Sequence, residues 1–184
     1  MEITPLALEG VFLIKPRRFS DARGYFAEIY NRRRFSDAGI KAEFVQDNQS
    51  YSSKAGTVRG LHFQYPPFAQ AKLVRALHGR IFDVAVDLRR ASPTLGHWIG
   101  QILTADGGEQ LFIPRGFAHG FCSLEDDVEV AYKVDAFYSP ECDSGLIWND
   151  PAINIDWPID ADSAILSNKD TNLGFFKDFN SPFN

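Results

Sequence analysis

Two segments of this sequence decide its fold: residues 56–64 (GTVRGLHFQ) and residues 108–119 (GEQLFIPRGFAH). Each combines glycine turns with a short apolar or aromatic run, which is typical of a β-strand next to a tight turn. Each also carries one histidine, His62 in the first segment and His119 in the second. We therefore expect strands and turns that hold two histidines in fixed positions.

The rest of the chain repeats this pattern, because short β-like runs alternate with turn signals along most of its length. Aromatic residues make up 14% of the sequence, which favours strands over helices. One short helix is expected at residues 31–38, ended by Gly39, and a helical turn near residues 161–165. A tight hairpin turn is expected at His78 and Gly79. Strands are expected at residues 11–15, 25–30, 44–51, 58–64, 71–77, 80–88, 98–103, 110–113, 120–124 and 128–134.

Residues 80–88 (RIFDVAVDL) show how these strands divide into faces. Every second residue from Phe82 is apolar, and we expect this face in the core. The other face carries Asp83 and Asp87, so we expect it toward water or the polar mouth of a barrel. About ten short strands at this spacing predict an all-β sandwich, jelly roll or barrel. No linker or repeat divides the chain, so residues 1–184 are expected to form one domain.

Charge and hydropathy exclude several classes of function. The net charge of −5 argues against a nucleic-acid coat, although a few arginines can still converge on one phosphate group. No apolar run approaches the roughly 20 residues of a membrane span, and no signal-peptide pattern is visible. We expect a cytoplasmic protein with no nucleic-acid or membrane partner, in which Cys122 and Cys142 are free thiols.

The two opening segments resemble the two motifs of the cupin fold, in which a glycine precedes a His-x-His pair and a Pro-x-Gly turn precedes a third histidine. The second motif matches through Pro114, Gly116 and His119, but Gln64 stands where the first has its second histidine. Lys72 lies in the stretch where a metal-binding cupin carries a ligand glutamate, and an ammonium repels a divalent cation. We therefore expect a cupin-type jelly-roll barrel with short flanking helices, no metal and no other cofactor.

Four longer segments together resemble the dTDP-4-dehydrorhamnose 3,5-epimerases: DARGYFAEIY (residues 21–30), FVQDNQSYSSKAGTVRGLHFQ (44–64), LFIPRGFAHGF (111–121) and YSPECDSGLIWND (138–150). The resemblance covers nearly the whole chain, roughly residues 3–173. It implies an isomerase that inverts C3 and C5 of dTDP-4-dehydro-6-deoxy-D-glucose to give dTDP-4-dehydro-L-rhamnose. The C4 ketone acidifies the neighbouring hydrogens, so a proton is removed, an enolate is held, and a proton returns to the opposite face.

Such a reaction needs a base, an acid on the other face, and a positive group at the enolate oxygen. The resemblance assigns His62 as the base, paired with Asp170, Tyr132 as the acid, and Lys72 as the group that stabilises the enolate. Histidine suits the first role because its unperturbed pKa of about 6.5 lets it take and give a proton near neutral pH.

The resemblance also implies the binding residues. It assigns Arg23 and Arg59 to the diphosphate, Glu28, Gln46 and Asn48 to the nucleoside, Tyr138 to stacking on thymine, and His119, Asp143 and Lys169 to the substrate pocket. Arginine suits the first task because its planar fork engages two oxygens together. In the family, residues 23–28 reach into the neighbouring subunit's site, which implies a homodimer.

Three alternatives stay open. The enzyme could invert only C3 or only C5, or move the ketone as a 3,4-ketoisomerase, on a similar dTDP-4-keto sugar. It could be a metal-dependent cupin oxygenase or isomerase, against which Gln64 and Lys72 argue. It could also be a sugar-nucleotide binder without catalysis, although such a binder has no use for the base and the acid.

Overall fold

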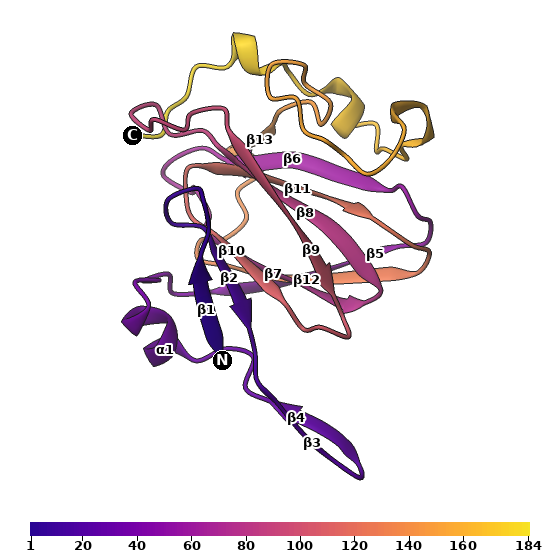
Figure 1. Ribbon diagram of the computed structural model, residues 1–184. Helices are drawn as coiled ribbons and strands as arrows, with labels where there is room; N and C mark the ends of the chain where they lie inside the picture. Colours follow the sequence, from indigo (N-terminus) through magenta and orange to yellow (C-terminus); the bar gives the residue numbers. More distant parts are fainter.

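Two antiparallel sheets packed face to face form the body of the molecule in the computed structural model, which describes residues 1–184 (Figure 1). The six-stranded sheet runs β1 (Glu2–Pro5), β2 (Phe12–Lys15), β10 (Gln110–Ile113), β7 (Lys72–His78), β12 (Val128–Val134), β5 (Gln46–Ser52). The five-stranded sheet runs β13 (Asp143–Gly145), β6 (Val58–Gln64), β11 (Phe117–Ser123), β8 (Arg80–Asp87), β9 (Trp98–Thr104). This arrangement confirms the all-β, cupin-type jelly roll.

The interior between the sheets is filled by apolar side chains from both of them. Strand alternation turns every second residue inward, so Val74 of β7 and Val130 of β12 meet Ile81 and Ala85 of β8 in one cluster. All four are almost completely buried. This cluster fixes the spacing of the sheets, while one part of the interior stays open and polar.

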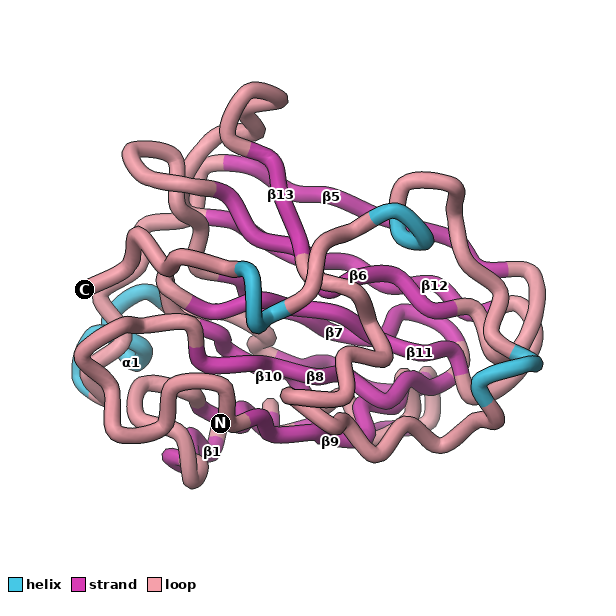
Figure 2. Tube along the Cα trace, turned by 90° about the horizontal axis from the view of Figure 1, so that it is seen from above, coloured by secondary structure: helices cyan, strands magenta, loops and turns pink.

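The C-terminal segment forms a third layer over the outer face of the five-stranded sheet (Figures 1 and 2). It consists of loops and three short 3₁₀ turns, η1 (Ala161–Ser163), η2 (Asp170–Asn172) and η3 (Phe176–Asp178). Parallel bridges pair Thr57 with Ile165 and Leu146 with Gly174, and so tie this layer to the sheet. Apolar residues of the layer pack on Val84, Val86 and Leu88 of β8. The helical turn expected near residues 161–165 is thereby confirmed as η1.

The face of β8 with Asp83 and Asp87 was expected toward water or the polar mouth of a barrel. The first of these alternatives is wrong, while the apolar face is buried as expected. The apolar face packs under the C-terminal layer, and the face with Asp83 and Asp87 points into the protein, where both carboxylates are fully buried. Alternation identifies the two faces of a strand, but it does not say whether a distant segment covers one of them. Cys122 and Cys142 are also buried, and they are not joined in a disulfide.

The expected hairpin at His78 and Gly79 is wrong as well. The turn exists, but it carries the chain from one sheet to the other: β7 pairs with β10 and β12, while β8 pairs with β11 and β9. Turn residues specify a reversal of the chain and leave the hydrogen-bonding partner open. Here both strands bury apolar residues in the shared interior, so each takes its neighbours from its own sheet.

The N-terminal third adds two projecting elements. Strands β3 (Arg18–Asp21) and β4 (Gly24–Ala27) form a separate hairpin that extends away from the body (Figure 1), so the strand expected at residues 25–30 ends early. The expected helix is α1 (Arg32–Asp37), where the Asn31 side chain caps the N-terminus and Phe35 is buried. No helix of the structure has the length and apolar character that crossing a membrane requires.

Candidate active site

The open part of the interior holds two cavities of about 380 and 360 Å³. Both are lined by His62, Lys72, Tyr132 and Lys169, so they form one continuous site. The first also contains Arg59, His119 and Asp170, and the second contains Gln46, Asn48, Tyr138 and Asp143. Residues that lie far apart in the sequence are thus brought to one place.

A β-bulge in β6 places Arg59 and His62 on the same side. Residues three apart normally face opposite sides of a strand, but His62 pairs with His119 and Arg59 with Phe121, so β6 has one residue more than β11 over this stretch. The extra residue lies at Gly60, whose φ is 128° and where an added Cβ would lie 2.6 Å from the Cα of Gly120. The glycine of the first motif is therefore needed for the site geometry.

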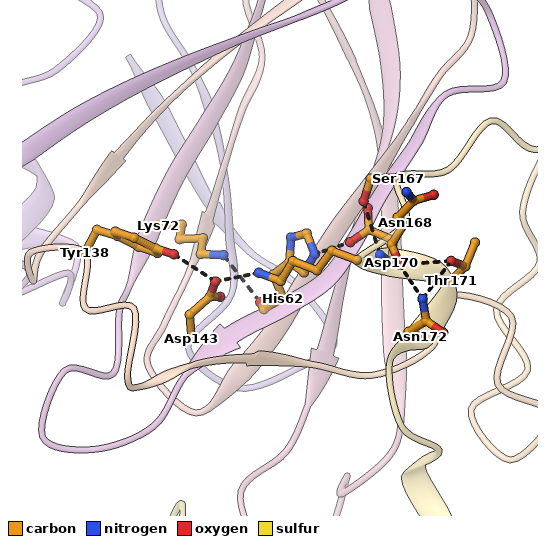
Figure 3. A network of polar contacts seen from close by, with 10 residues as sticks. His62, Lys72, Tyr138, Asp143, Ser167, Asn168, Asp170, Thr171 and Asn172 are labelled. Carbon is orange, nitrogen blue, oxygen red and sulfur yellow. Dashed lines mark hydrogen bonds and ion pairs between the residues drawn. The ribbon is translucent and has the colours of Figure 1, made fainter.

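His62 and Asp170, which both line the first cavity, form a close pair (Figure 3). Nε2 of His62 lies 2.6 Å from Oδ1 of Asp170, which begins the 3₁₀ turn η2 in the C-terminal layer. Burial opposes ionisation of Asp170, but the hydrogen bonds from His62, Ser167 and the Gly60 backbone outweigh it and hold the pKa below its ordinary value. The carboxylate therefore holds the ring by Nε2, and Nδ1 is left to exchange protons.

Lys72 enters the cavity from β7, in the opposite sheet. It is buried, and its Nζ donates a long hydrogen bond of 3.4 Å to the backbone oxygen of His62. Burial lowers the pKa of Lys72 to about 8, while the charges of Asp83 and Asp143 favour the ammonium. At neutral pH the site thus contains a cation in a partly desolvated setting.

Tyr132 also comes from the six-stranded sheet, on β12, and is half-buried. Burial raises the pKa of its phenol, Asp143 adds to this effect, and Arg59 opposes it. The phenol is therefore protonated at neutral pH and can donate a proton. His62 and Tyr132 approach the cavity from different sheets, the relation that a base and an acid on opposite faces of a bound ring require.

His119 forms a second pair, with Asp83, deeper in the barrel. Its Nε2 lies 2.7 Å from Oδ1 of Asp83, and both side chains are buried. Burial lowers the pKa of His119, and Lys72 adds to this against the opposing effect of Asp83. The sequence expectation missed Asp83, although the two carboxylates spaced by four in β8 were a visible signal.

Residues that line the second cavity form a hydrogen-bonded chain, and Figure 3 shows the part of it that contains Tyr138 and Asp143. The Tyr138 hydroxyl donates to Asp143 at 3.1 Å, and Lys169 forms an ion pair with the same carboxylate. Gln46 donates to the Asn48 side chain at 2.8 Å and accepts from the Tyr138 backbone at 3.1 Å. Tyr138 is 56% exposed, so its ring is available for stacking.

Gln64, at the position of a cupin metal ligand, uses its whole amide for structure. It donates to the backbone oxygens of Phe68 and Phe137 and accepts from the Ser139 backbone. It thereby ties together the two loops beside the site. No group of three or more His, Cys, Asp or Glu side chains is placed to hold a metal ion. That the site works without metal stays a prediction.

Arg23 and Glu28 are the two predicted site residues that the fold does not bring to this cavity in the same chain. Arg23 lies at the tip of the β3–β4 hairpin and pairs with Asp21. Glu28 follows the hairpin and contacts Asn31 and Arg34. That both residues serve the site of a neighbouring subunit stays a prediction.

Comparison with known proteins decides the family. The family model described as dTDP-4-dehydrorhamnose 3,5-epimerase matches residues 5–178. This chain belongs to that family. The family's Shigella flexneri enzyme, dTDP-4-dehydrorhamnose 3,5-epimerase, is 48% identical over 179 residues, which cover 97% of each protein.

Solved structures of the 3,5-epimerase family agree over nearly the full chain. The Bacillus anthracis enzyme, crystallised with TDP and PPi, superposes with a TM-score of 0.91 at 48% identity, covering 95% of this chain and 98% of that one. The Legionella pneumophila enzyme in complex with dTDP-4-keto-L-rhamnose superposes with a TM-score of 0.92 at 39% identity, covering 97% and 94%. The resemblance stated from the sequence is therefore confirmed.

Proposed function

We propose that this chain inverts C3 and C5 of dTDP-4-dehydro-6-deoxy-D-glucose to give dTDP-4-dehydro-L-rhamnose, without a cofactor. Membership of the 3,5-epimerase family makes it an isomerase. The single observation that carries the assignment to residues is that His62, Tyr132 and Lys72 line one cavity, with the base and the acid on different sheets.

In the proposed reaction His62 takes the proton from the carbon next to the ketone. The Asp170 carboxylate, 2.6 Å away, orients the ring and stabilises the imidazolium that forms. The Lys72 ammonium stabilises the negative charge that develops on the C4 oxygen, and the protonated Tyr132 returns a proton from the opposite side. Positioned acid and base groups contribute about 10²- to 10⁴-fold each, and one preorganised charge contact about 10²- to 10³-fold.

The nucleotide would lie across the outer cavity. Tyr138 would stack on thymine, Gln46 and Asn48 would hold the nucleoside, and Arg59 would bind the diphosphate. Arg59 suits this role because two of its nitrogens are already fixed, Nε by Ser52 at 3.3 Å and Nη2 by the Tyr51 backbone at 2.8 Å. His119, Asp143 and Lys169 would line the sugar end.

We also propose that the chain is a single domain that works as a homodimer. The β3–β4 hairpin supports this, because it projects from the body and exposes 53%, 58% and 72% of Phe19, Tyr25 and Phe26. An exposed aromatic hairpin favours burial against a partner. In the dimer, Arg23 and Glu28 would complete the site of the second copy, and light scattering would reveal a mass of twice 20.7 kDa.

The test is proton exchange in heavy water. The protein is incubated with the dTDP-4-keto-6-deoxy sugar and a chelator, and the C3 and C5 signals are followed by NMR. Loss of both signals with inversion supports the double epimerase, and loss of one identifies a mono-epimerase. No exchange by a folded protein that binds the nucleotide would refute catalysis, and exchange only after metal is restored would revive the metal-dependent alternative.

A further inference from the structure

Asp83 is a buried charge that the reaction scheme leaves without a role. It lies on the inward face of β8 and is fully buried. Oδ1 contacts His119, but Oδ2 is buried and has no hydrogen-bond partner. Leaving a carboxylate oxygen unpaired in the interior costs free energy. Packing alone therefore gives no reason to keep this residue here.

The nearby cation gives such a reason. Lys72 is buried, and its one hydrogen bond, to the His62 backbone, is long. Among the charges that act on Lys72, Asp83 favours its protonated form most, ahead of Asp143, while Lys169 opposes it. Since burial has already brought the pKa of Lys72 to about 8, losing a neighbouring negative charge would neutralise it close to neutral pH.

The other charged groups of the cavity are engaged elsewhere. Asp170 is held by His62, and Asp143 is held by Lys169 and Tyr138. Arg59 lines the same cavity from β6 and is itself a cation, so it offers Lys72 no counter-charge. The remaining titratable groups that line this cavity, His62, His119 and Tyr132, supply no permanent negative charge. Asp83 is therefore the negative charge that the fold provides for the Lys72 ammonium.

We propose that Asp83 is a positioning residue of the epimerisation, whose carboxylate fixes the His119 ring by Nε2 and keeps the Lys72 ammonium charged. This inference rests on the proposed function, in which Lys72 stabilises the enolate. Asp83 is fully buried and is not among the residues that line the cavity, so it does not contact the sugar in the proposed reaction. It acts through two residues that line the cavity.

One carboxylate can serve both neighbours because they differ in charge. Burial lowers the pKa of His119 and the Lys72 charge lowers it further, so His119 is neutral. A neutral imidazole has one N–H, and its donation to Asp83 leaves Nδ1 as an acceptor for a sugar hydroxyl. The negative charge of Asp83 is then shared with Lys72, whose positive charge meets the enolate oxygen as it forms.

The decisive variant is Asp83→Asn, which keeps the size of the side chain and an oxygen acceptor but removes the charge. Lys72 is active when protonated, so activity is present below its pKa and lost above it. An opposite charge at close range shifts a pKa by about 1 to 3 units. We expect the alkaline limb of the kcat profile to move down by about one pH unit or more, with kcat at pH 8 reduced about fivefold or more and KM little changed.

Asp87→Asn is the matched control, because Asp87 lies on the same face of the same strand and is equally buried. Its carboxylate is bound by Arg89, Ser92 and Thr94, away from the cavity. We expect this variant to lose stability and keep the parent's alkaline limb. Asp83→Glu, which restores the charge, should return the limb toward its original position. An alkaline limb that stays in place in Asp83→Asn would overturn the proposal.

A second measurement does not depend on turnover. The Lys72 side chain can be titrated by NMR in protein labelled with ¹³C at lysine Cε, with Lys72→Met to assign the signal. We expect a pKa near 8 in the parent and a lower one in Asp83→Asn. A Lys72 pKa that is the same in Asp83→Asn as in the parent would refute the proposal even if the enzyme is active. If the Lys72 pKa is lower in Asp83→Asn but the parent protein exchanges no sugar proton, the proposed function alone is refuted.

If Asp83→Asn does not fold, Lys72→Arg tests the same link. Arginine stays charged over the whole working pH range, so the alkaline limb near pH 8 should disappear while some activity remains. A limb that persists in Lys72→Arg would show that another group controls it, and the role given to Asp83 would be wrong.

Discussion

Two histidine–aspartate pairs lie next to each other in this barrel and differ in almost every respect. His62 and His119 are direct partners across β6 and β11. The His62 side chain is 29% exposed, and its aspartate arrives on a 3₁₀ turn of the C-terminal layer. The His119 side chain is 7% exposed, and its aspartate lies on the neighbouring strand β8. The same two residue types thus form an accessible pair and a buried pair.

The difference in setting separates the two tasks. The accessible ring can exchange protons with a substrate, and its aspartate is anionic because hydrogen bonds hold the pKa of Asp170 low. The buried ring stays neutral because burial lowers the pKa of His119. The first pair is suited to moving a proton, and the second to holding geometry and charge. Substitutions in the two pairs and beside them test this division.

His62→Asn should have the largest effect. Removing the base eliminates proton abstraction at both carbons, and we expect kcat to fall by about 10³-fold or more. Because the side chain is partly exposed, the thermal midpoint should change little. Exchange of the C3 and C5 protons measured by NMR gives the result, with His78→Asn as the control, since His78 is exposed and far from the cavity. A variant that exchanges at the parent rate would assign the base elsewhere.

Asp170→Asn should come next, because it leaves the base in place and removes the charge that supports it. An asparagine can still contact the ring, but it stabilises the imidazolium poorly and can hold the wrong tautomer. We expect kcat to fall by about 10²- to 10³-fold with little change in KM. Single-turnover kinetics measure this separately from product release. If kcat fell less in Asp170→Asn than in Asp83→Asn, the roles assigned to the two pairs would have to be exchanged.

The two histidine–aspartate pairs differ in how much of their structure the sequence predicts. The motif around Arg59, Gly60 and His62 predicts a strand with a functional histidine, and β6 has the predicted bounds, Val58–Gln64. The resemblance also names Asp170, whose position depends on the path of a distant segment. The sequence does not reveal the bulge at Gly60, since strand register is set by the partner strand.

The sequence names His119 as a site residue, but it does not reveal that His119 is paired with Asp83. Alternation in β8 marks Asp83 and Asp87 as sharing a face, but burial of that face depends on the opposite sheet, and burial of the other face on the C-terminal layer. For the same reason the partners of β7 and β8 were predicted wrongly. Contacts between residues far apart in the chain decide both the burial of a strand face and the choice of a strand's partner.

Tyr132→Phe should act on one half of the reaction. The base still removes and returns protons from its own side, so exchange with heavy water continues, while inversion falls by about 10²-fold because no acid serves the other face. Comparing the rate of deuterium entry with the rate of product formation in the same sample measures the split. Equal losses in both rates would mean that Tyr132 does not act as the acid of the opposite face.

Asp87→Asn should have the smallest effect on turnover and a clear one on stability. Burial opposes ionisation of Asp87, but hydrogen bonds from Arg89, Ser92 and Thr94 bring its pKa to about 2. A depressed pKa stabilises the fold above the unfolded value, 3.8, and this contribution is lost as the pH falls toward 2. Linkage gives about 2 kcal/mol for such a shift. Urea unfolding at pH 7 and pH 3 should show the parent losing more stability than Asp87→Asn, while kcat at pH 7 is unchanged. A marked loss of kcat would mean that a buried carboxylate elsewhere on β8 also affects the reaction, and the particular role given to Asp83 would be wrong.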